Sequence, residues 1–198
     1  MLTIILIQII EGFFVKSVAS FDDTLSRIPI LLELTRTRKG KIAFSIGTLL
    51  ALTLIIIIAI FFSNIFDLIP YRNQVVAFLI LLLAVGVYFK IFSKKPEKEV
   101  EKVIAKVNLD ASKLSRLVLT GFVISFITLI DDMIVLLPLF HGDNPSRLYS
   151  IIGVYLATVI QIVIVIYFSH KIGNIKYTRE ISSLALVFLA ILVAIGII

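Results

Sequence analysis

Apolar residues in this chain gather in six long segments separated by short charged ones. Each segment has about the 20 residues, or more, that an α-helix needs to cross the hydrocarbon core of a bilayer. The pattern therefore predicts an all-α fold, a polytopic membrane protein of six transmembrane helices. The expected helices cover residues 5–34, 42–63, 74–93, 114–140, 148–169 and 180–198.

The composition excludes a water-soluble domain of this size and favours lipid as the surroundings. Of 198 residues, 60% are hydrophobic and 16% are charged, which is more apolar surface than a single soluble core can bury. The net charge of +6 does not indicate a nucleic-acid partner, because the basic residues lie in short segments between the apolar ones. The absence of cysteine removes thiolate as a metal ligand.

The basic residues also predict the orientation of the chain. They concentrate after the first, third and fifth segments, whereas only Arg72 and Arg147 follow the second and the fourth. Since cytoplasmic loops carry an excess of Lys and Arg, both termini are expected to lie outside. The charged stretch 94–113, in which Glu and Lys surround apolar residues, is expected to be a cytoplasmic amphipathic linker.

Two acidic motifs interrupt the apolar segments. Asp22-Asp23 is followed by Pro29, and Asp131-Asp132 by Pro138, with 109 positions between the motifs. An ionised Asp at the centre of a transmembrane helix costs on the order of 3 kcal/mol. Four such carboxylates favour a shared cation site.

The acidic motifs belong to a longer internal repeat. Gly12-Phe13 matches Gly121-Phe122 at the same spacing, and after a three-residue deletion Gly47 and Ala51 match Gly153 and Ala157. These small residues predict close helix contacts in both repeats. Residues 1–93 and 114–198 then form two repeats of three helices, and because three is odd the second is inverted relative to the first. Transporters of this architecture bind their substrate near the bilayer midplane.

Backbone carbonyls beside the Asp pairs are further candidate ligands. Pro29 and Pro138 cannot donate to the carbonyls of Leu25 and Ile134, one turn after the first Asp of each motif. Two such half-sites would offer about six oxygens, as a hard divalent ion prefers. The alternative is that each proline only kinks its helix. The predicted metal ligands are Asp22, Asp23, Asp131, Asp132, Leu25 and Ile134.

Internal salt bridges are an alternative role for the carboxylates. Arg27 follows Asp23 by four residues and Lys16 precedes it by seven, so both share its helix face. Neither base has a counterpart in the second repeat, which leaves Asp131 and Asp132 without a partner on their own helix. One divalent cation would neutralise the remaining negative charge. Because adjacent carboxylates repel, we expect a proton to bind when the cation leaves, and therefore exchange of the cation for protons.

Polar side chains near the acidic pairs could line an ion path. Ser20, Thr24 and Thr128 lie within two turns of an Asp pair, and Gln161 is strongly polar and deep in the fifth segment. Serine and threonine within helices also bond their own backbone, so both roles stay open for them.

Two short sequences resemble a known family. Ala19-Ser20-Phe21-Asp22, and Asp131-Asp132 with Leu137-Pro138-Leu139-Phe140, are similar to the cadmium-resistance transporter family of the lysine exporter superfamily, which is related to tellurium-resistance and manganese-exporter proteins. The resemblance implies a cation exporter of the prokaryotic plasma (inner) membrane, with Asp22 and Asp131 as principal ligands. Both motifs here carry a doubled Asp, and Met133 is the only soft ligand nearby. An all-oxygen site favours Mn²⁺, Ca²⁺ or Mg²⁺ over Cd²⁺.

Two other classes of protein also use acidic residues within the membrane. An exporter of a basic amino acid or another organic cation would need an apolar lining beside the acids. An intramembrane aspartyl protease also needs two Asp, but neither motif has the Gly-x-Gly-Asp context that those enzymes resemble. We therefore expect no enzymatic activity and no resident cofactor. The expected partners are membrane lipid and the transported metal ion, and a homo-oligomer is left open.

Overall fold

The chain is described by a computed structural model that covers residues 2–20, 38–89, 114–141, 144–172 and 178–197. Within these ranges the protein is all-helical and contains no strand. The predicted site residues Asp22, Asp23, Thr24, Leu25 and Arg27, and the predicted linker 94–113, lie outside the described residues. The elements are α1 (Leu2–Ala19), α3 (Arg38–Phe66), α4 (Arg72–Tyr88), α6 (Leu114–Thr128), α7 (Asp132–Leu136), the 3₁₀ helix η1 (Pro138–Phe140), α8 (Asn144–Ile172) and α9 (Thr178–Ile195).

Several helices are apolar on the surface of the protein, as expected next to lipid. In the described residues two helices, Lys39–Phe66 and Pro145–Tyr167, are long and apolar enough to cross a membrane, and α6 with Asp132–Phe140 would make a third if the bent pair is one span. The helices α4 and α9 are apolar but shorter. Large apolar side chains such as Phe61, Phe78 and Leu184 are more than half exposed, which is unfavourable in water and favourable in lipid.

The continuous helix expected over 114–140 is wrong, because the chain breaks between α6 and α7 and turns by 70°. The break begins after Thr128, whose Oγ1 donates to the carbonyls of Ile124 and Ser125 at 3.1 and 3.2 Å. It ends where the Asp131 carboxylate accepts the backbone N–H of Asp132 at 3.2 Å. Pro138 begins η1 instead of causing this bend. The local hydrogen bonds of Thr128 and Asp131 therefore locate the break, and the proline does not.

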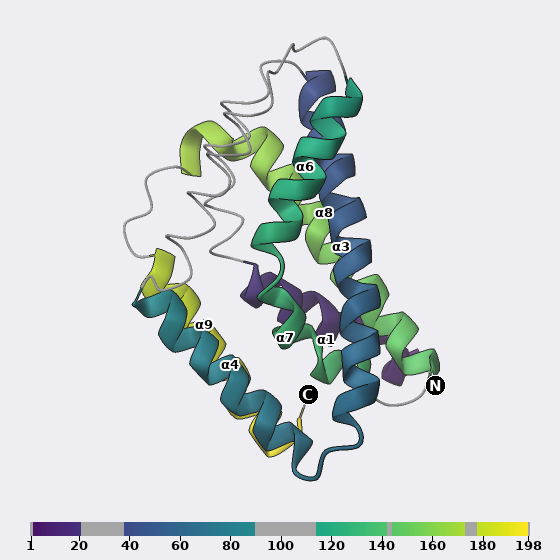
Figure 1. The fold of residues 1–198 in the computed structure, drawn as a ribbon, viewed down its shortest axis with the longest axis vertical. Coiled ribbons are helices and arrows are strands. Elements are labelled where there is room, and N and C mark those ends of the chain that lie inside the picture. The colour runs from purple at the N-terminus through teal and green to yellow at the C-terminus, as the bar shows by residue number, and fades with distance from the viewer. Residues whose placement is uncertain (1, 21–37, 90–113, 142–143, 173–177, 198) are drawn as a thin grey trace.

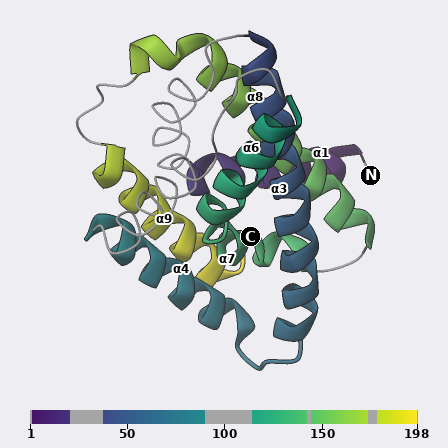
Figure 2. The same cartoon turned by 45° about the horizontal axis from the view of Figure 1, so that its top comes forward.

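The helices pack as three pairs around a central short helix. The pairs are α1 with α8, α3 with α6 and α4 with α9, and α7 contacts α1, α3 and α4 (Figure 1). Figure 2 shows the α4–α9 pair lying apart from α3 and α6, with α7 between them. This arrangement places the N-terminal residues of α7, which carry the second acidic motif, in the interior of the protein.

Four glycines allow the first two pairs to pack with their backbones in contact. A Cβ on Gly12 would lie 2.2 Å from the Ser150 carbonyl, and one on Gly121 would lie 2.4 Å from the Phe44 carbonyl. Likewise a Cβ on Gly47 or Gly153 would lie 2.1 Å from the carbonyl of Val118 or Ile9. The predicted close helix contacts are confirmed. These glycine contacts of α1 with α8 have equivalents between α6 and α3 at the offsets found in the sequence.

Candidate functional site

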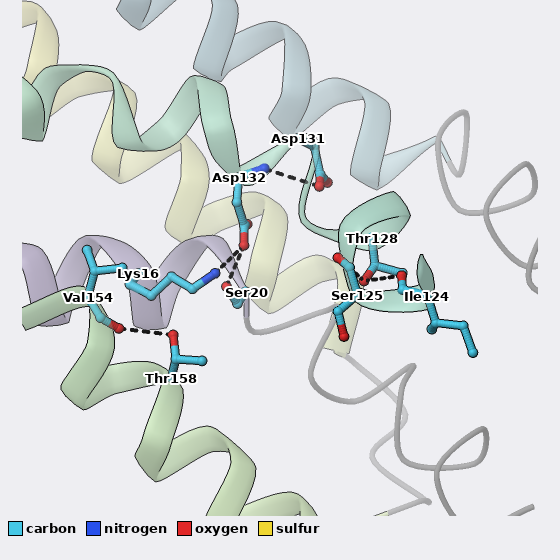
Figure 3. Close-up of polar contacts among 9 residues, drawn as sticks. All are labelled: Lys16, Ser20, Ile124, Ser125, Thr128, Asp131, Asp132, Val154 and Thr158. Atoms are coloured by element: carbon cyan, nitrogen blue, oxygen red, sulfur yellow. Dashed lines mark hydrogen bonds and ion pairs between the residues drawn. The ribbon is translucent and has the colours of Figure 1, made fainter. Parts of the chain in front are cut away.

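A buried ion pair joins α1 to the start of α7. The ammonium of Lys16 contacts the Asp132 carboxylate oxygen Oδ2, and the two side chains are only 0% and 2% exposed (Figure 3). The residues are 116 positions apart, so this contact depends on the tertiary structure. Breaking such a buried pair by removing one partner typically costs about 3–5 kcal/mol, because the other charge is left uncompensated.

Ser20 supplies a second donor to the same carboxylate. Its hydroxyl donates to Asp132 Oδ2 at 2.7 Å, and its backbone N–H donates to the Lys16 carbonyl at 3.1 Å. The two polar side chains thus come from one turn at the end of α1 and meet the same oxygen atom. Lys16 and Ser20, predicted as a charge partner and an ion-path residue, are brought together with Asp132. The sequence had placed Lys16 on the helix face of Asp23, outside the described residues.

Asp131 lies beside this pair and is less buried than Asp132. Among the described residues it forms no ion pair. Both carboxylates line a small cavity of about 20 Å³ whose walls come from α1, α4, α7 and α9, and which we call the Asp131 cavity. Its other lining residues are Ala19, Leu83, Val87, Val135, Ser182 and Leu186. A cavity of this volume has room for a single water or a bare ion.

The remaining predicted residues of the described part do not join this cluster. The Thr128 hydroxyl bonds its own helix, which is the alternative role noted above. Gln161 is half-buried on α8, and no hydrogen bond within the described ranges links it to Lys16 or Asp132. The Ile134 carbonyl accepts the Leu137 N–H at 3.4 Å, so Pro138 does not leave it without a donor. One lone pair of that carbonyl stays available to a ligand.

A larger polar cavity lies at the other end of α1 and was not anticipated from the sequence. It measures about 330 Å³ and is lined by residues including Gln8, Glu11, Arg72, Asn73, His141 and Ser150; we call it the Glu11 cavity. Gln8 and Glu11 precede Lys16 by about two turns and one turn on the inward face of α1, whose next members Gly12 and Val15 are buried. Two polar residues spaced by three within an apolar segment are the signal that could have indicated this cavity.

A cluster of charged residues around Asp67 lies beside the Glu11 cavity. Asp67 Oδ1 accepts from His141 Nδ1 at 2.5 Å and from Arg72 Nη1 at 3.3 Å, while Arg147 Nη2 lies 3.8 Å from Asp67 Oδ2. These residues come from the connection after α3, the start of α4, the end of η1 and the start of α8. Asp67 thus links the connection between α3 and α4 to the connection between η1 and α8, at the same end of the protein.

Neither a preformed metal cluster nor a known relative defines the site. Across the described ranges, no group of three or more His, Cys, Asp or Glu side chains could hold a metal ion. No protein-family model, curated protein or solved structure matches the chain. The evidence for function therefore consists of the buried Lys16–Asp132 pair, the Asp131 cavity beside it and the Glu11 cavity.

Proposed function

We propose that this protein is a membrane transporter that exports a divalent metal cation, in exchange for protons, through a site that includes Asp131 and Asp132. The single observation that carries the proposal is a pair of carboxylates in the interior, at a break in an apolar helix, of which only Asp132 is neutralised by a base from the described residues. Ionisable side chains inside a membrane are expensive and typically mark ion or substrate pathways. Broken helices at membrane depth are tolerated where they line a cavity, and transporters use them as binding sites.

The proposed architecture is two inverted repeats with six transmembrane helices. The equivalent glycine contacts of α1 with α8 and of α6 with α3 support it, because a two-fold relation between repeats would produce such pairs. Contacts of α3 with two neighbours support the alternating orientation. Phe44 and Thr48 of α3 meet Gly121 and Ser125 of α6 in the same order, whereas Lys41 and Thr53 of α3 meet Ile166 and Tyr155 of α8 in the opposite order. The ligands from the first repeat, Asp22 and Asp23, stay predictions.

Cation transport by reconstituted protein tests this proposal. Proteoliposomes containing the full chain should take up one or more ions of a panel of Mn²⁺, Ca²⁺, Mg²⁺, Cd²⁺ and Zn²⁺, with the oxygen-preferring ions Mn²⁺, Ca²⁺ and Mg²⁺ favoured. Asp131→Asn should abolish this uptake, because it removes the carboxylate that no described base neutralises. Glu180→Gln is the matched control, since Glu180 is exposed at the start of α9.

The same assay distinguishes the competing substrate class. Uptake of lysine or arginine by the native chain, with no response to any metal ion in the panel, would replace the metal exporter by an organic-cation exporter. Metal uptake that does not respond to an imposed proton gradient would remove proton exchange from the mechanism and leave the cation site intact.

A further inference from the structure

We infer that Lys16 is a tethered substitute for the transported cation. Its ammonium occupies Asp132 when no ion is bound and moves toward the Glu11 cavity when an ion binds. The inference rests on the proposed function and identifies how its site is held when empty. It is argued from the contacts of Lys16, the space around Asp132 and the composition of α1.

The first argument is the position of the ammonium. Lys16 Nζ and Ser20 Oγ both contact Asp132 Oδ2, so one of the two oxygens that Asp132 could offer a metal is already occupied by a positive charge. The pair is almost fully buried, and its partners come from α1 and α7, on either side of the Asp131 cavity. A divalent ion that binds Asp131 and Asp132 together must displace this ammonium, because like charges at close range repel strongly in a medium of low dielectric constant.

The second argument is space. The Asp131 cavity has a volume of about 20 Å³, which is enough for one ion or one water. This free space adjoins the Asp132 carboxylate that Lys16 contacts and is too small to hold an ion far from that ammonium. Cation and ammonium therefore exclude each other, and Asp132 is shared between them in turn.

The third argument is that α1 provides a second position for the ammonium. Side chains of a helix lean toward its N-terminus, and Glu11 lies five residues before Lys16, about 7.5 Å along the helix axis. The ammonium would have to pass beside Gly12, whose backbone packs against the Ser150 carbonyl. Glu11 is half-buried, lines the cavity of about 330 Å³, and among the described residues forms no ion pair. A displaced Lys16 would therefore move toward a polar cavity and an available carboxylate, which limits the cost of leaving Asp132.

Binding of MnCl₂ to the full chain purified in detergent, measured by isothermal titration calorimetry, tests the inference. If the ammonium occupies Asp132 for nine-tenths of the time, Lys16→Met should tighten the dissociation constant about tenfold. Lys16→Arg should weaken binding, because a guanidinium binds a carboxylate through two hydrogen bonds. Lys39→Met is the control, since it removes the same charge from an exposed position on α3.

Glu11 makes the test specific to movement of Lys16. Glu11→Gln should weaken Mn²⁺ binding severalfold in the native chain, since the displaced ammonium loses its second carboxylate. In the Lys16→Met background the same change should have no effect, and Glu180→Gln should be silent in both. A Glu11→Gln effect that persists without Lys16 would overturn the second position of the ammonium.

The outcomes separate this inference from the proposed function. Equal Mn²⁺ affinity of the native chain, Lys16→Met and Lys16→Arg would overturn the inference and leave a cation site at Asp131 and Asp132. Absence of binding to the native chain and to every variant would refute both. If Lys16→Met does not give folded protein, Lys16→Arg keeps the ion pair and still decides the question, because a competing side-chain cation predicts weaker binding and its absence predicts unchanged affinity.

Discussion

The energetic coupling between Lys16 and Asp132 is the most direct consequence of the structure that can be measured without knowing the substrate. Lys16→Met leaves a carboxylate that is 2% exposed with one described hydroxyl donor, Ser20. Asp132→Asn leaves a fully buried ammonium. Each single change should destabilise the protein by about 3–5 kcal/mol, the usual cost of an unpaired buried charge.

The double variant Lys16→Met/Asp132→Asn removes both charges and should be far less affected than the two singles together. Replacing a buried ion pair by neutral side chains of similar volume is often close to neutral. If the double variant loses no more than about 2 kcal/mol, the interaction energy of the pair is at least about 4 kcal/mol in favour of the native combination. Lys39→Met, at an exposed position, should change stability by less than about 0.5 kcal/mol.

Thermal unfolding in one detergent is the appropriate assay, followed by circular dichroism because the chain contains no tryptophan. For a chain of this length 1 kcal/mol corresponds to about 2–4 °C in Tm, so each single variant should lose roughly 6–20 °C. Additive effects of the two single changes would refute the pairing. Coupling of Lys16 with Asp23→Asn instead of Asp132→Asn would favour the local salt bridge that the sequence suggests.

Two further predictions concern the framework around the site. Gly47→Ala should destabilise the protein by more than about 1 kcal/mol, because its Cβ would lie 2.1 Å from the Val118 backbone carbonyl and a backbone shift is costly. Ser45→Ala on the same helix is the control in thermal unfolding. Equal Tm values for the two variants would contradict the close packing. Asp67→Asn should lower the free energy of unfolding by up to about 1 kcal/mol, since the ion pairs of Asp67 are partly exposed. The difference in Tm from the native chain should shrink in 1 M NaCl. A difference that does not depend on salt would show that charge is not its cause.

The helices and their close contacts could be predicted from the sequence, because both depend on local pattern. Apolar segments of sufficient length predicted every described long helix, and Gly47 and Gly153 predicted where two helices approach. The break after Thr128 could not be predicted in the same way. Pro138 indicated a kink through its missing N–H, but the bend lies between Thr128 and Asp132, where Thr128 and Asp131 form hydrogen bonds with their own backbone neighbours. Such bonds also occur within continuous helices and at helix ends, so the residue types alone did not locate the break.

The Lys16–Asp132 pair could not be predicted from helical spacing, although the sequence contained charges that needed partners. Helical spacing could associate Lys16 only with acids on its own helix, and so with Asp23. Yet the sequence held unmatched charges of both signs, since Lys16 and Arg27 correspond to Ser125 and Leu136 in the second repeat, and Asp131 and Asp132 have no base beside them on their helix. In an apolar environment such charges must find each other or another ion, so their complementarity was a long-range signal.

Comparison of the two sequence repeats shows that the helix-packing residues are duplicated, whereas the polar residues around Asp132 are not. The glycines that set the helix packing match between the two halves in residue type and in contact. The polar residues at Asp132 do not, because Lys16 and Ser20 correspond to Ser125 and Leu129, and Ser125 instead shares a hydrogen bond of 2.8 Å with Thr48. Packing can be duplicated without cost, whereas a second tethered ammonium would neutralise the charge that a cation is proposed to bind. The placement of one lysine in only one half is therefore compatible with the proposed single cation site, because it leaves net negative charge for the ion.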